Sequence, residues 1–583
     1  MRIEPSEAAG LGGQGSAVRF CYMPYPCAFS HVVSARPTLT ILLVRFLFGY
    51  VITLSMAGAR EHDVRALGAA GDGRTLDTAA IQRALDAAAA EGGGTVVLPA
   101  GVYLSFSLRL RSQVALRLEA GSVLRAATPA PGFGAYDNPE PNLWDMYQDF
   151  GHSHWRNSLL WGENLENISI TGPGRIDGAG LTRRGPGPRR VEKPGDTPTT
   201  LKDAADAARA VDPEGKAKGR DEFAAMIGEG NKALALKLCR NVVLRDFTVL
   251  NGGHFALLAT GVDNLLIDNV TVETQRDGFD IDACRHVRIA NCAVNTPNDD
   301  AIVLKSSFAL GFARPTENVV ITGCQVSGFD PGTLLDGTRG RTQEFAPDRD
   351  RVTGRIKFGT ESNGGFRNIT INNCVFERCR GIALETVDGG VLEDVNISNL
   401  TMREITTAPI FLRVGRRLRG PEGATIGGMR RIRLSNITVY DADPNYASIL
   451  AGLPEHEIED VSLSHIRIVA AGGGTAEQAA REMPENELAY PEPSMFGITS
   501  AHGLYIRHVK GLRVEDVRFE TLRPDVRPAV VAESASGLVF EAVAGGRRDG
   551  GAEFVFKNVE GVTLRDCAGR EDRRLGAVKR AEF

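Results

Sequence analysis

Short stretches in which apolar and polar residues alternate recur along most of this chain. Each repeat reads apolar-x-apolar, a polar turn, then apolar-x-apolar again, as in CRNVVLRDFTV (239–249), VDNLLIDNVTV (262–272) and CRHVRIANCAV (284–294). This alternation predicts short, half-buried strands, and its recurrence predicts a repeat architecture. Further copies lie at 164–178, 316–328, 366–379, 392–402, 429–439, 458–468 and 509–519, with weaker ones in 535–567.

The interval between repeats is about 22 residues and grows to about 50 where a loop is inserted, which is typical of a solenoid. The units carry neither a Leu-Asn framework nor amphipathic helices, so a leucine-rich or helical repeat lacks support. A β-propeller would need antiparallel blades at longer, more regular spacing. The sequence therefore predicts an all-β fold, a right-handed parallel β-helix.

One helix is predicted ahead of the repeats, in TAAIQRALDAAAAEGGG (78–94). Asp77 or Thr78 can cap it, alanines fill it, and the glycine run ends it. Strand-like segments follow at 95–105 and 113–127. A helix in this place can cap the open end of the solenoid core, which would otherwise expose apolar surface.

Residues 61–570 are predicted to form a single β-helix domain, with loop insertions at 180–232, 328–353 and 470–503. Loops of this kind build the walls of a substrate cleft on a solenoid. Residues 571–583 are predicted to be a charged tail.

The first 60 residues (1–60) are either a signal-like or a mis-assigned N-terminal segment. Their apolar run, 40–54, is short for a membrane span and contains Arg45, so no stable membrane span is expected. The protein is expected to be exported, to the periplasm or outside the cell, if residues 40–59 are a signal. It is expected to be cytoplasmic if translation starts near Met56.

Composition narrows the functional classes. The formal net charge is −5, which does not indicate a basic nucleic-acid-binding face. Among the nine cysteines, Cys292, Cys324 and Cys374 each follow Asn or Gly at the same point of a repeat, which favours a ladder of buried thiols over disulfides. No CxxC pair or histidine cluster with ligand spacing is present, so neither a metal nor another cofactor is expected.

Two acidic clusters lie one repeat apart: Asp277 in QRDGFDID, and Asp299 with Asp300 in NTPNDDAIVLKSS. The step from Asp277 to Asp299 is 22 residues, so stacked coils would bring the three carboxylates about one strand spacing, ~4.8 Å, apart. Like charges this close raise the pKa of at least one of them. Glycoside hydrolysis requires such a group, together with a base and room for a water. The nearby Asp280 and Asp282 are interpreted as turn residues.

Several motifs resemble the polygalacturonase family, glycoside hydrolase family 28. They are ALGAAGDGRTLDT (66–78), GGGTVVLPAGVY (92–103), ITGPGRIDG (170–178) and DGFDIDACRHVRIANCAVNTPNDDAIVLKS (277–306), in family order. The resemblance covers roughly residues 62–445. It implies an inverting hydrolase on a right-handed β-helix.

Catalytic roles follow from this resemblance alone. Asp299 would be the general acid that protonates the leaving oxygen, and Asp277 and Asp300 would hold and activate the attacking water. Lys305 matches a basic residue that follows the pair in the family.

The chain departs from the family pattern around this core. Residues 275–277 read Gln-Arg-Asp in place of Asn-Thr-Asp, and Gly354 stands where the family has a histidine. A literal Arg-Ile-Lys occurs at 355–357, but the matching Arg-Ile-Lys position carries Ala383 and Glu385. The acid chemistry is expected to be intact and the sugar recognition rebuilt. The candidate substrate-binding residues are Lys305, Arg355, Lys357, Glu361, Glu385 and Arg413.

Two roles are open for Arg355, Lys357 and Arg413. They either bind a substrate carboxylate or neutralise the neighbouring glutamates. The leading hypothesis is an inverting glycoside hydrolase acting on pectin-type oligosaccharides or polysaccharides, derived from galacturonate or rhamnogalacturonan chains. The alternatives are a polysaccharide lyase and a non-catalytic carbohydrate-binding solenoid, since β-helices host all three. No nucleic-acid partner is expected, and the oligomeric state stays open.

Overall fold

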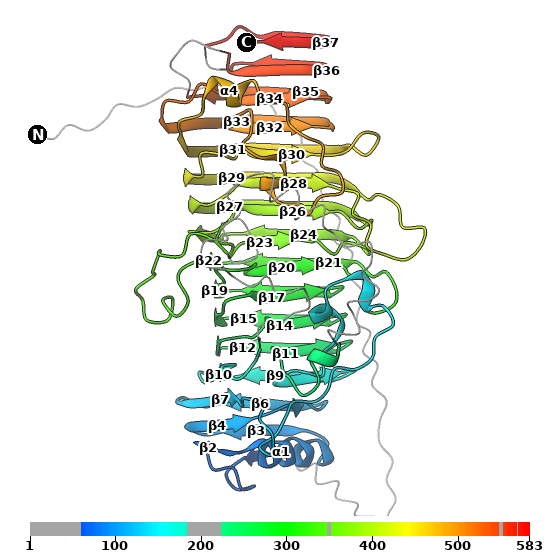
Figure 1. Cartoon of the computed structure of the whole chain (residues 1–583), viewed down its shortest axis with the longest axis vertical. Coiled ribbons are helices and arrows are strands. Elements are labelled where there is room, and N and C mark those ends of the chain that lie inside the picture. Colours follow the sequence, from blue (N-terminus) through cyan, green and yellow to red (C-terminus); the bar gives the residue numbers. More distant parts are fainter. Residues whose placement is uncertain (1–59, 183–222, 347–350, 547–551, 568) are drawn as a thin grey trace, which may run out of the picture. The chain divides into compact units, whose positions relative to one another are not determined.

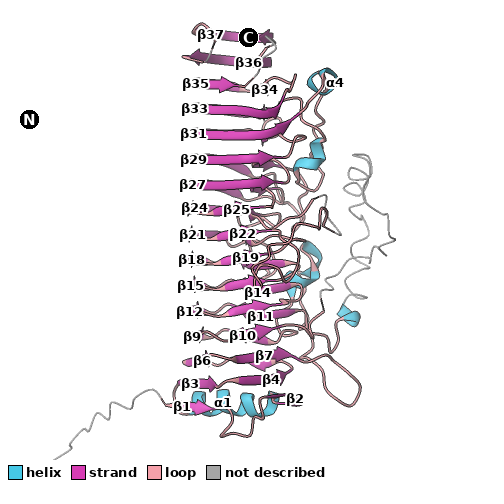
Figure 2. Ribbon diagram, turned by 90° about the vertical axis from the view of Figure 1, so that its left-hand side faces the viewer, coloured by secondary structure: helices cyan, strands magenta, loops and turns pink. Residues whose placement is uncertain are grey.

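The computed structural model describes residues 60–182, 223–346, 351–546, 552–567 and 569–583. Their strands stack coil upon coil, as Figures 1 and 2 show, and the named strands pair in parallel except for the last pair. The predicted all-β parallel β-helix is confirmed. Within these residues no helix is both long and apolar enough to cross a membrane. The predicted N-terminal segment and residues 183–222 of the first insertion lie outside the described residues.

Three ladders of parallel strands make up the lower coils. Ladder 1 consists of β5 (Leu108–Arg109), β8 (Leu160–Glu163), β11 (Lys232–Lys237), β14 (Phe255–Thr260), β17 (Asp277–Asp282), β20 (Ile302–Lys305), β23 (Ile356–Phe358), β26 (Ile382–Thr386), β28 (Ile410–Val414), β30 (Ser448–Ala451), β32 (Leu504–Arg507) and β34 (Val530–Glu533). Ladder 2 begins with β1 (Glu61–Asp63), β3 (Gly94–Leu98), β6 (Val114–Leu118), β9 (Glu166–Thr171), β12 (Arg240–Arg245), β15 (Asp263–Asp268), β18 (Arg285–Ala290), β21 (Thr316–Thr322) and β24 (Phe366–Asn372). Ladder 3 begins with β2 (Asp72–Leu76), β4 (Gly101–Ser105), β7 (Ser122–Ala126), β10 (Arg175–Asp177), β13 (Thr248–Leu250), β16 (Thr271–Glu273), β19 (Ala293–Asn295), β22 (Gln325–Ser327) and β25 (Val375–Glu377).

Ladders 2 and 3 merge in the upper coils, because one long strand pairs with both β24 and β25. The merged strands are β27 (Val391–Ile405), β29 (Gly428–Ala442), β31 (Ile458–Gly472), β33 (Val509–Arg523), β35 (Ser536–Gly545) and β36 (Phe554–Arg565). Ladder 1 stays separate up to β34, which pairs with the start of β36.

The repeat pattern places one side of each strand in the core. In β15, Leu265 and Ile267 are buried while their neighbours are partly exposed. Asn264 lies at a positive φ of 57°, and its side-chain amide donates to Asn241 Oδ1 of the coil below at 2.9 Å. Asparagine tolerates this left-handed backbone and forms polar ladders at the turns. The predicted thiol ladder is borne out among the described residues, whose cysteines are all free and buried.

The predicted helix is α1 (Thr78–Ala90), and it buries Ile81 and Leu85 against the first coils. Asp77 is its N-cap residue by position, yet its carboxylate accepts hydrogen bonds from Ala70 N at 2.7 Å and Gly71 N at 3.1 Å. The side chain therefore ties the preceding turn to the helix start and leaves the helix amides uncapped. The helix lies at the end of the solenoid where the strands begin (Figure 1).

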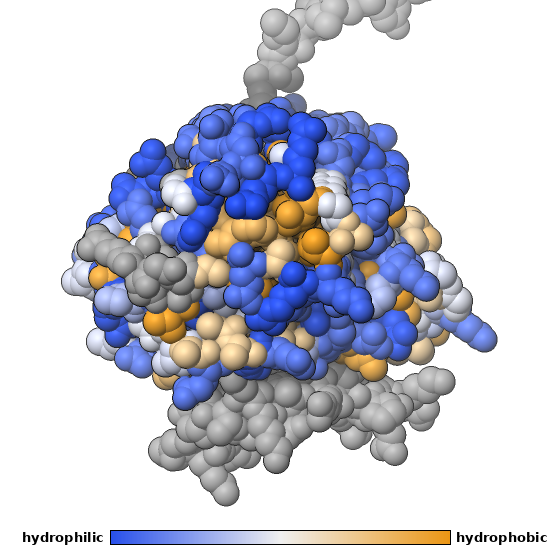
Figure 3. Space-filling view, turned by 90° about the horizontal axis from the view of Figure 1, so that it is seen from above, coloured by the Kyte–Doolittle hydropathy of each residue, from blue (hydrophilic) through white to orange (hydrophobic). Residues whose placement is uncertain are grey.

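The prediction of a charged tail at 571–583 is wrong. Arg573–Glu582 form β37, which pairs antiparallel with β36. Without it, the last strand would expose an unpaired edge. Leu575, Val578 and Phe583 pack partly against the core while the charged neighbours face outward. Figure 3 looks onto this end and shows apolar residues gathered in its middle with hydrophilic residues around them.

Further short helices lie outside the strands, two between β7 and β8 and two in the 470–503 insertion. These are η1 (Asp145–Tyr147), η2 (Phe150–Ser153), α4 (Ala476–Ala479) and η3 (Pro493–Phe496). Glu273, at the end of β16, accepts hydrogen bonds from Gly332 N at 3.0 Å and Leu334 N at 2.9 Å. One buried carboxylate thus anchors the start of the 328–353 insertion to the end of β16, which directly precedes the strand that carries Asp277.

Candidate active site

Asp277 opens β17, and Asp299 and Asp300 directly precede β20 in the next coil. Stacking is maintained by the backbone, because Gly278 N donates to Asp300 O at 2.9 Å. The amide of Asp300 faces Asp277 Oδ1 at 3.4 Å, and one oxygen of each of the three carboxylates lies within 4.8 Å of the others. The one-repeat spacing therefore brings this trio together.

The trio is nearly closed off from solvent. Asp277, Asp299 and Asp300 expose 5%, 4% and 5% of their surface. Burial, followed by the charges of Asp299 and Asp280, raises the pKa of Asp277 well above its usual value. Asp277 therefore retains a proton under conditions in which an ordinary aspartate is ionised.

Asp299 is held through both its side chain and its backbone. Arg276 Nη2 lies 2.8 Å from Asp299 Oδ2. The carbonyl of Asp299 accepts hydrogen bonds from Thr296 Oγ1 at 2.8 Å and Gly354 N at 2.8 Å, and from the hydroxyl of Thr353. These donors fix the peptide that carries the candidate acid.

Gly354, which stands where the family has a histidine, has a steric reason to be glycine. Its φ is +78°, and a Cβ there would lie 2.1 Å from the carbonyl oxygen of Ser327. No side chain fits in this backbone, so the histidine role has no substitute at this position.

Asp300 belongs to a buried ionic cluster on ladder 1. Arg355 Nε lies 3.0 Å from Asp300 Oδ1, and Lys357 Nζ lies 3.5 Å from Asp300 Oδ2. Lys357 Nζ also lies 3.5 Å from Glu385 Oε2. Burial raises the pKa of Glu385 to about 7, against the opposing effect of Lys357 and Arg355. Arg355 and Lys357 of the Arg-Ile-Lys sequence thus both form ion pairs with Asp300 of the trio.

Tyr490 and Glu492, which no sequence motif indicated, reach this cluster from the 470–503 insertion. Arg355 Nη2 lies 2.7 Å from Glu492 Oε1, and Arg380 Nη1 lies 2.8 Å from the same oxygen. Lys357 Nζ lies 3.3 Å from the Tyr490 hydroxyl. A loop inserted more than a hundred residues away from the motif has no local signal that places it here.

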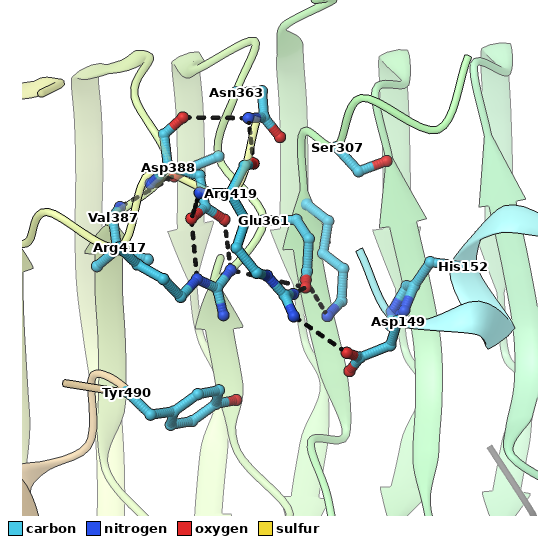
Figure 4. A network of polar contacts seen from close by, with 12 residues as sticks. Asp149, His152, Ser307, Glu361, Asn363, Val387, Asp388, Arg417, Arg419 and Tyr490 are labelled. Carbon is cyan, nitrogen blue, oxygen red and sulfur yellow. Dashed lines mark hydrogen bonds and ion pairs between the residues drawn. The ribbon is translucent and has the colours of Figure 1, made fainter. Parts of the chain in front are cut away.

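Lys305 and Glu361 form a second ionic cluster, and the charge of Lys305 acts on Asp277. Lys305 Nζ donates to Glu361 Oε2 at 2.8 Å, and Arg419 Nη2 donates to Glu361 Oε1 at 2.5 Å. Figure 4 shows Arg419 between Glu361 and Asp149, and Arg417 on Asp388. Burial opposes ionisation of Glu361, but Lys305 and the other surrounding cations hold its pKa well below the usual value.

Arg413 lies apart from the trio contacts. Its Nη1 donates to Gly452 O at 3.1 Å and its Nη2 to Glu485 O at 2.9 Å, and its guanidinium lies over the Phe496 ring. These contacts join ladder 1 to the 470–503 insertion. Of the six predicted substrate-binding residues, the other five lie in the two ionic clusters around the trio.

The interpretation of Asp280 and Asp282 as turn residues is wrong. Both lie inside β17 and are fully buried. His152 Nε2, from η2, lies 3.1 Å from Asp280 Oδ2, and Ser307 Oγ donates to Asp282 Oδ2 at 2.6 Å. The alternation in DGFDID could have predicted this strand position, because it puts these two carboxylates on one strand face, opposite Phe279.

Comparison with known protein families agrees with this arrangement. The family model of glycosyl hydrolases family 28 matches residues 211–329, which include the trio. The model "Rhamnogalacturonase A/epimerase, pectate lyase-like" matches residues 62–120, at the start of the solenoid. The matched segment contributes strands to a parallel β-helix and holds the carboxylate cluster on its ladder 1. The segment that carries the trio therefore resembles glycosyl hydrolases family 28.

Individual relatives are distant. A probable polygalacturonase of Vitis vinifera is 24% identical over 371 residues, covering 61% of this chain and 63% of the relative. An exo-poly-alpha-D-galacturonosidase of Dickeya chrysanthemi is 26% identical over 287 residues, covering 46% of this chain and 45% of the relative. The chain thus spans less than two thirds of the length of either relative. The solved structure of a hyperthermoactive exopolygalacturonase from Thermotoga maritima shares the fold, with a TM-score of 0.56 and 19% identity over 79% of this chain and 92% of that one.

Proposed function

We propose that the protein is an inverting glycoside hydrolase that acts on pectin-type oligosaccharides. The observation that carries the proposal is the buried trio, whose carboxylate oxygens lie within 4.8 Å of one another in the segment matched by the family 28 model. Asp299 protonates the leaving oxygen, as the family resemblance implies. Asp277 and Asp300 hold and activate the water that attacks the sugar.

Because Asp277 has the raised pKa, the acid role of Asp299 requires that the trio shares one proton, which lies on Asp299 when the leaving oxygen is protonated. Asp299 is among the charges that raise the pKa of Asp277, so protonation of either group relieves the repulsion on the other. Such coupling supports a trio that carries one proton and keeps a carboxylate available as base.

Inversion rests on the family resemblance. The two carboxyl groups of an inverting pair are in general about 6.5–9.5 Å apart, which leaves room for a water. The closest oxygens of this trio lie nearer than that, within 4.8 Å. The anomeric configuration of the product is therefore the decisive measurement of this part of the proposal.

The charges around the trio support a neutral or branched sugar unit at one subsite. Among the residues that the structure describes there, Arg276, Lys305, Arg355 and Lys357 each contact a carboxylate of the protein itself. A uronate carboxylate would compete with these partners. We therefore propose a rhamnogalacturonan-type fragment as a better substrate than smooth polygalacturonan. Cleavage from a chain end agrees with the name of the Dickeya chrysanthemi relative.

The test is a panel of pectic oligosaccharides, including polygalacturonan and rhamnogalacturonan oligomers, with product sizes followed over time. NMR of the first-formed sugar should show the inverted anomer. A retained anomer would contradict inversion, and rapid mid-chain cutting of polygalacturonan would contradict the substrate proposal. An unsaturated, ultraviolet-absorbing product would indicate a lyase, and sugar binding without new reducing ends would indicate a binding solenoid.

A further inference from the structure

The 470–503 insertion packs on the outer face of ladder 1 through its own apolar contacts. Met483, Met495 and Phe496 join a buried cluster with outward-facing residues of the ladder, including Phe411 and Tyr505. Arg413 adds the hydrogen bonds to Gly452 and Glu485 described above. The insertion is therefore seated on the solenoid over the coils that follow the trio.

This packing places the carboxylate of Glu492 next to the cations beside Asp300. Its Oε1 lies 2.7 Å from Arg355 Nη2, 2.8 Å from Arg380 Nη1 and 3.9 Å from Lys357 Nζ. Glu492 exposes 8% of its surface, and the three cations expose 2% or less. The chain itself thus supplies an anion where two guanidinium groups converge next to a candidate catalytic carboxylate.

The charges of this cluster balance when Glu385, whose pKa is raised to about 7, is ionised. Three cations, Arg355, Lys357 and Arg380, face three carboxylates, Asp300, Glu385 and Glu492. A further carboxylate brought beside Asp300 would leave one buried negative charge uncompensated among these residues, which is strongly unfavourable at low local dielectric. A neutral hydroxyl group carries no such penalty.

We propose that Glu492 is a specificity-determining residue: its carboxylate occupies the Arg355–Arg380 pair, so that the sugar unit bound beside Asp300 is neutral and uronate is rejected there. This inference rests on the proposed glycosidase function for its kinetic consequence. Removing the Glu492 carboxylate frees the cation pair and opens the position to an external carboxylate.

The first test does not depend on activity. In Glu492→Ala, the vacated cation pair should bind a small carboxylate, so acetate should raise the melting temperature of this variant saturably, whereas chloride at equal ionic strength should not. Neither the parent protein nor Glu487→Ala should respond. Glu487 lies in the same insertion but pairs with Arg416 near the surface, which makes it a matched control. A folded Glu492→Ala that ignores acetate would overturn the inference.

The second test compares pectic oligosaccharides with the same oligosaccharides after chemical reduction of their carboxyl groups. Glu492→Gln keeps an oxygen for hydrogen bonding and serves if the alanine variant does not fold. We expect it to shift the ratio of kcat/KM for the acidic over the reduced substrate at least tenfold toward the acidic one, with Glu487→Gln unchanged. An unchanged ratio in folded Glu492→Gln would assign Glu492 a purely structural role. If the parent protein cleaves neither substrate, the glycosidase proposal fails while the acetate test still decides the role of Glu492.

Discussion

Arg355 Nε lies 3.0 Å from Oδ1 of Asp300, and both side chains are almost fully buried. The two residues sit in consecutive coils, where the Arg355 carbonyl also accepts a hydrogen bond from Ala301 N at 2.9 Å. Backbone stacking and side-chain charge thus hold one of the candidate catalytic carboxylates from the coil that follows it.

Arg355→Met should therefore destabilise the protein and abolish activity. It leaves the buried carboxylates of Asp300 and Glu492 short of a cation, which costs about 3–5 kcal/mol. Urea unfolding of the two proteins gives this difference. Arg433→Met is the control, because Arg433 pairs with Asp460 at the surface and its removal should cost less than about 1 kcal/mol. Equal losses in the free energy of unfolding for the two variants would contradict the role of Arg355 in stabilising the buried carboxylates.

Asp299→Asn should abolish turnover and leave the fold intact, since amide and carboxylate are nearly isosteric. Asp277→Asn and Asp300→Asn should each lose several orders of magnitude in kcat. Asp394→Asn, which removes a surface carboxylate paired with Arg431, should keep full activity. Initial rates and circular dichroism of the four variants provide the measurement. Normal turnover by Asp299→Asn would remove Asp299 from the acid role.

Glu385 should make stability depend on pH. Its pKa rises from the usual 4.5 to about 7 on folding, because it is buried. Between these pH values the folded state binds more protons than the unfolded chain, so stability falls as the pH rises through this window. Asp282, whose pKa burial raises to about 6, acts in the same direction.

The variant Glu385→Gln removes the Glu385 contribution. The free energy of unfolding of this variant relative to the parent should increase by up to about 3 kcal/mol between pH 4.5 and pH 7, at roughly 1.4 kcal/mol per pKa unit. Unfolding curves at several pH values measure this difference, with Glu487→Gln as control. Parallel pH profiles of parent and Glu385→Gln would show that Glu385 titrates normally.

Activity should survive exhaustive chelation. The trio is surrounded by Arg276, Arg355 and Lys357, whose positive charges oppose binding of a divalent cation to the same carboxylates. Rates before and after treatment with EDTA, and after addition of calcium, provide the test. Loss on chelation with rescue by calcium would favour the lyase alternative.

Much of the fold could be predicted from the sequence, because the apolar positions recur with a regular period. The alternation of apolar positions defines strands, and a repeat of about 22 residues stacks them, so the contact of Asp277 with Asp299 and Asp300 follows from spacing alone. The charged composition of the C-terminal residues was misleading, since an edge strand such as β37 presents charged side chains to solvent just as a tail does.

The sequence by itself therefore determined the solenoid, its capping helix and the carboxylate trio, all of which depend on residues within one or two repeats. Only the tertiary structure decided what surrounds the trio. Arg355 and Glu492 are 137 residues apart, and His152 and Asp280 are 128 apart. Inserted loops bring these pairs together. Because the loops differ in length and conformation, their residues lie at no fixed sequence spacing from the residues they contact. The charge balance of the site is thus a property of the folded chain.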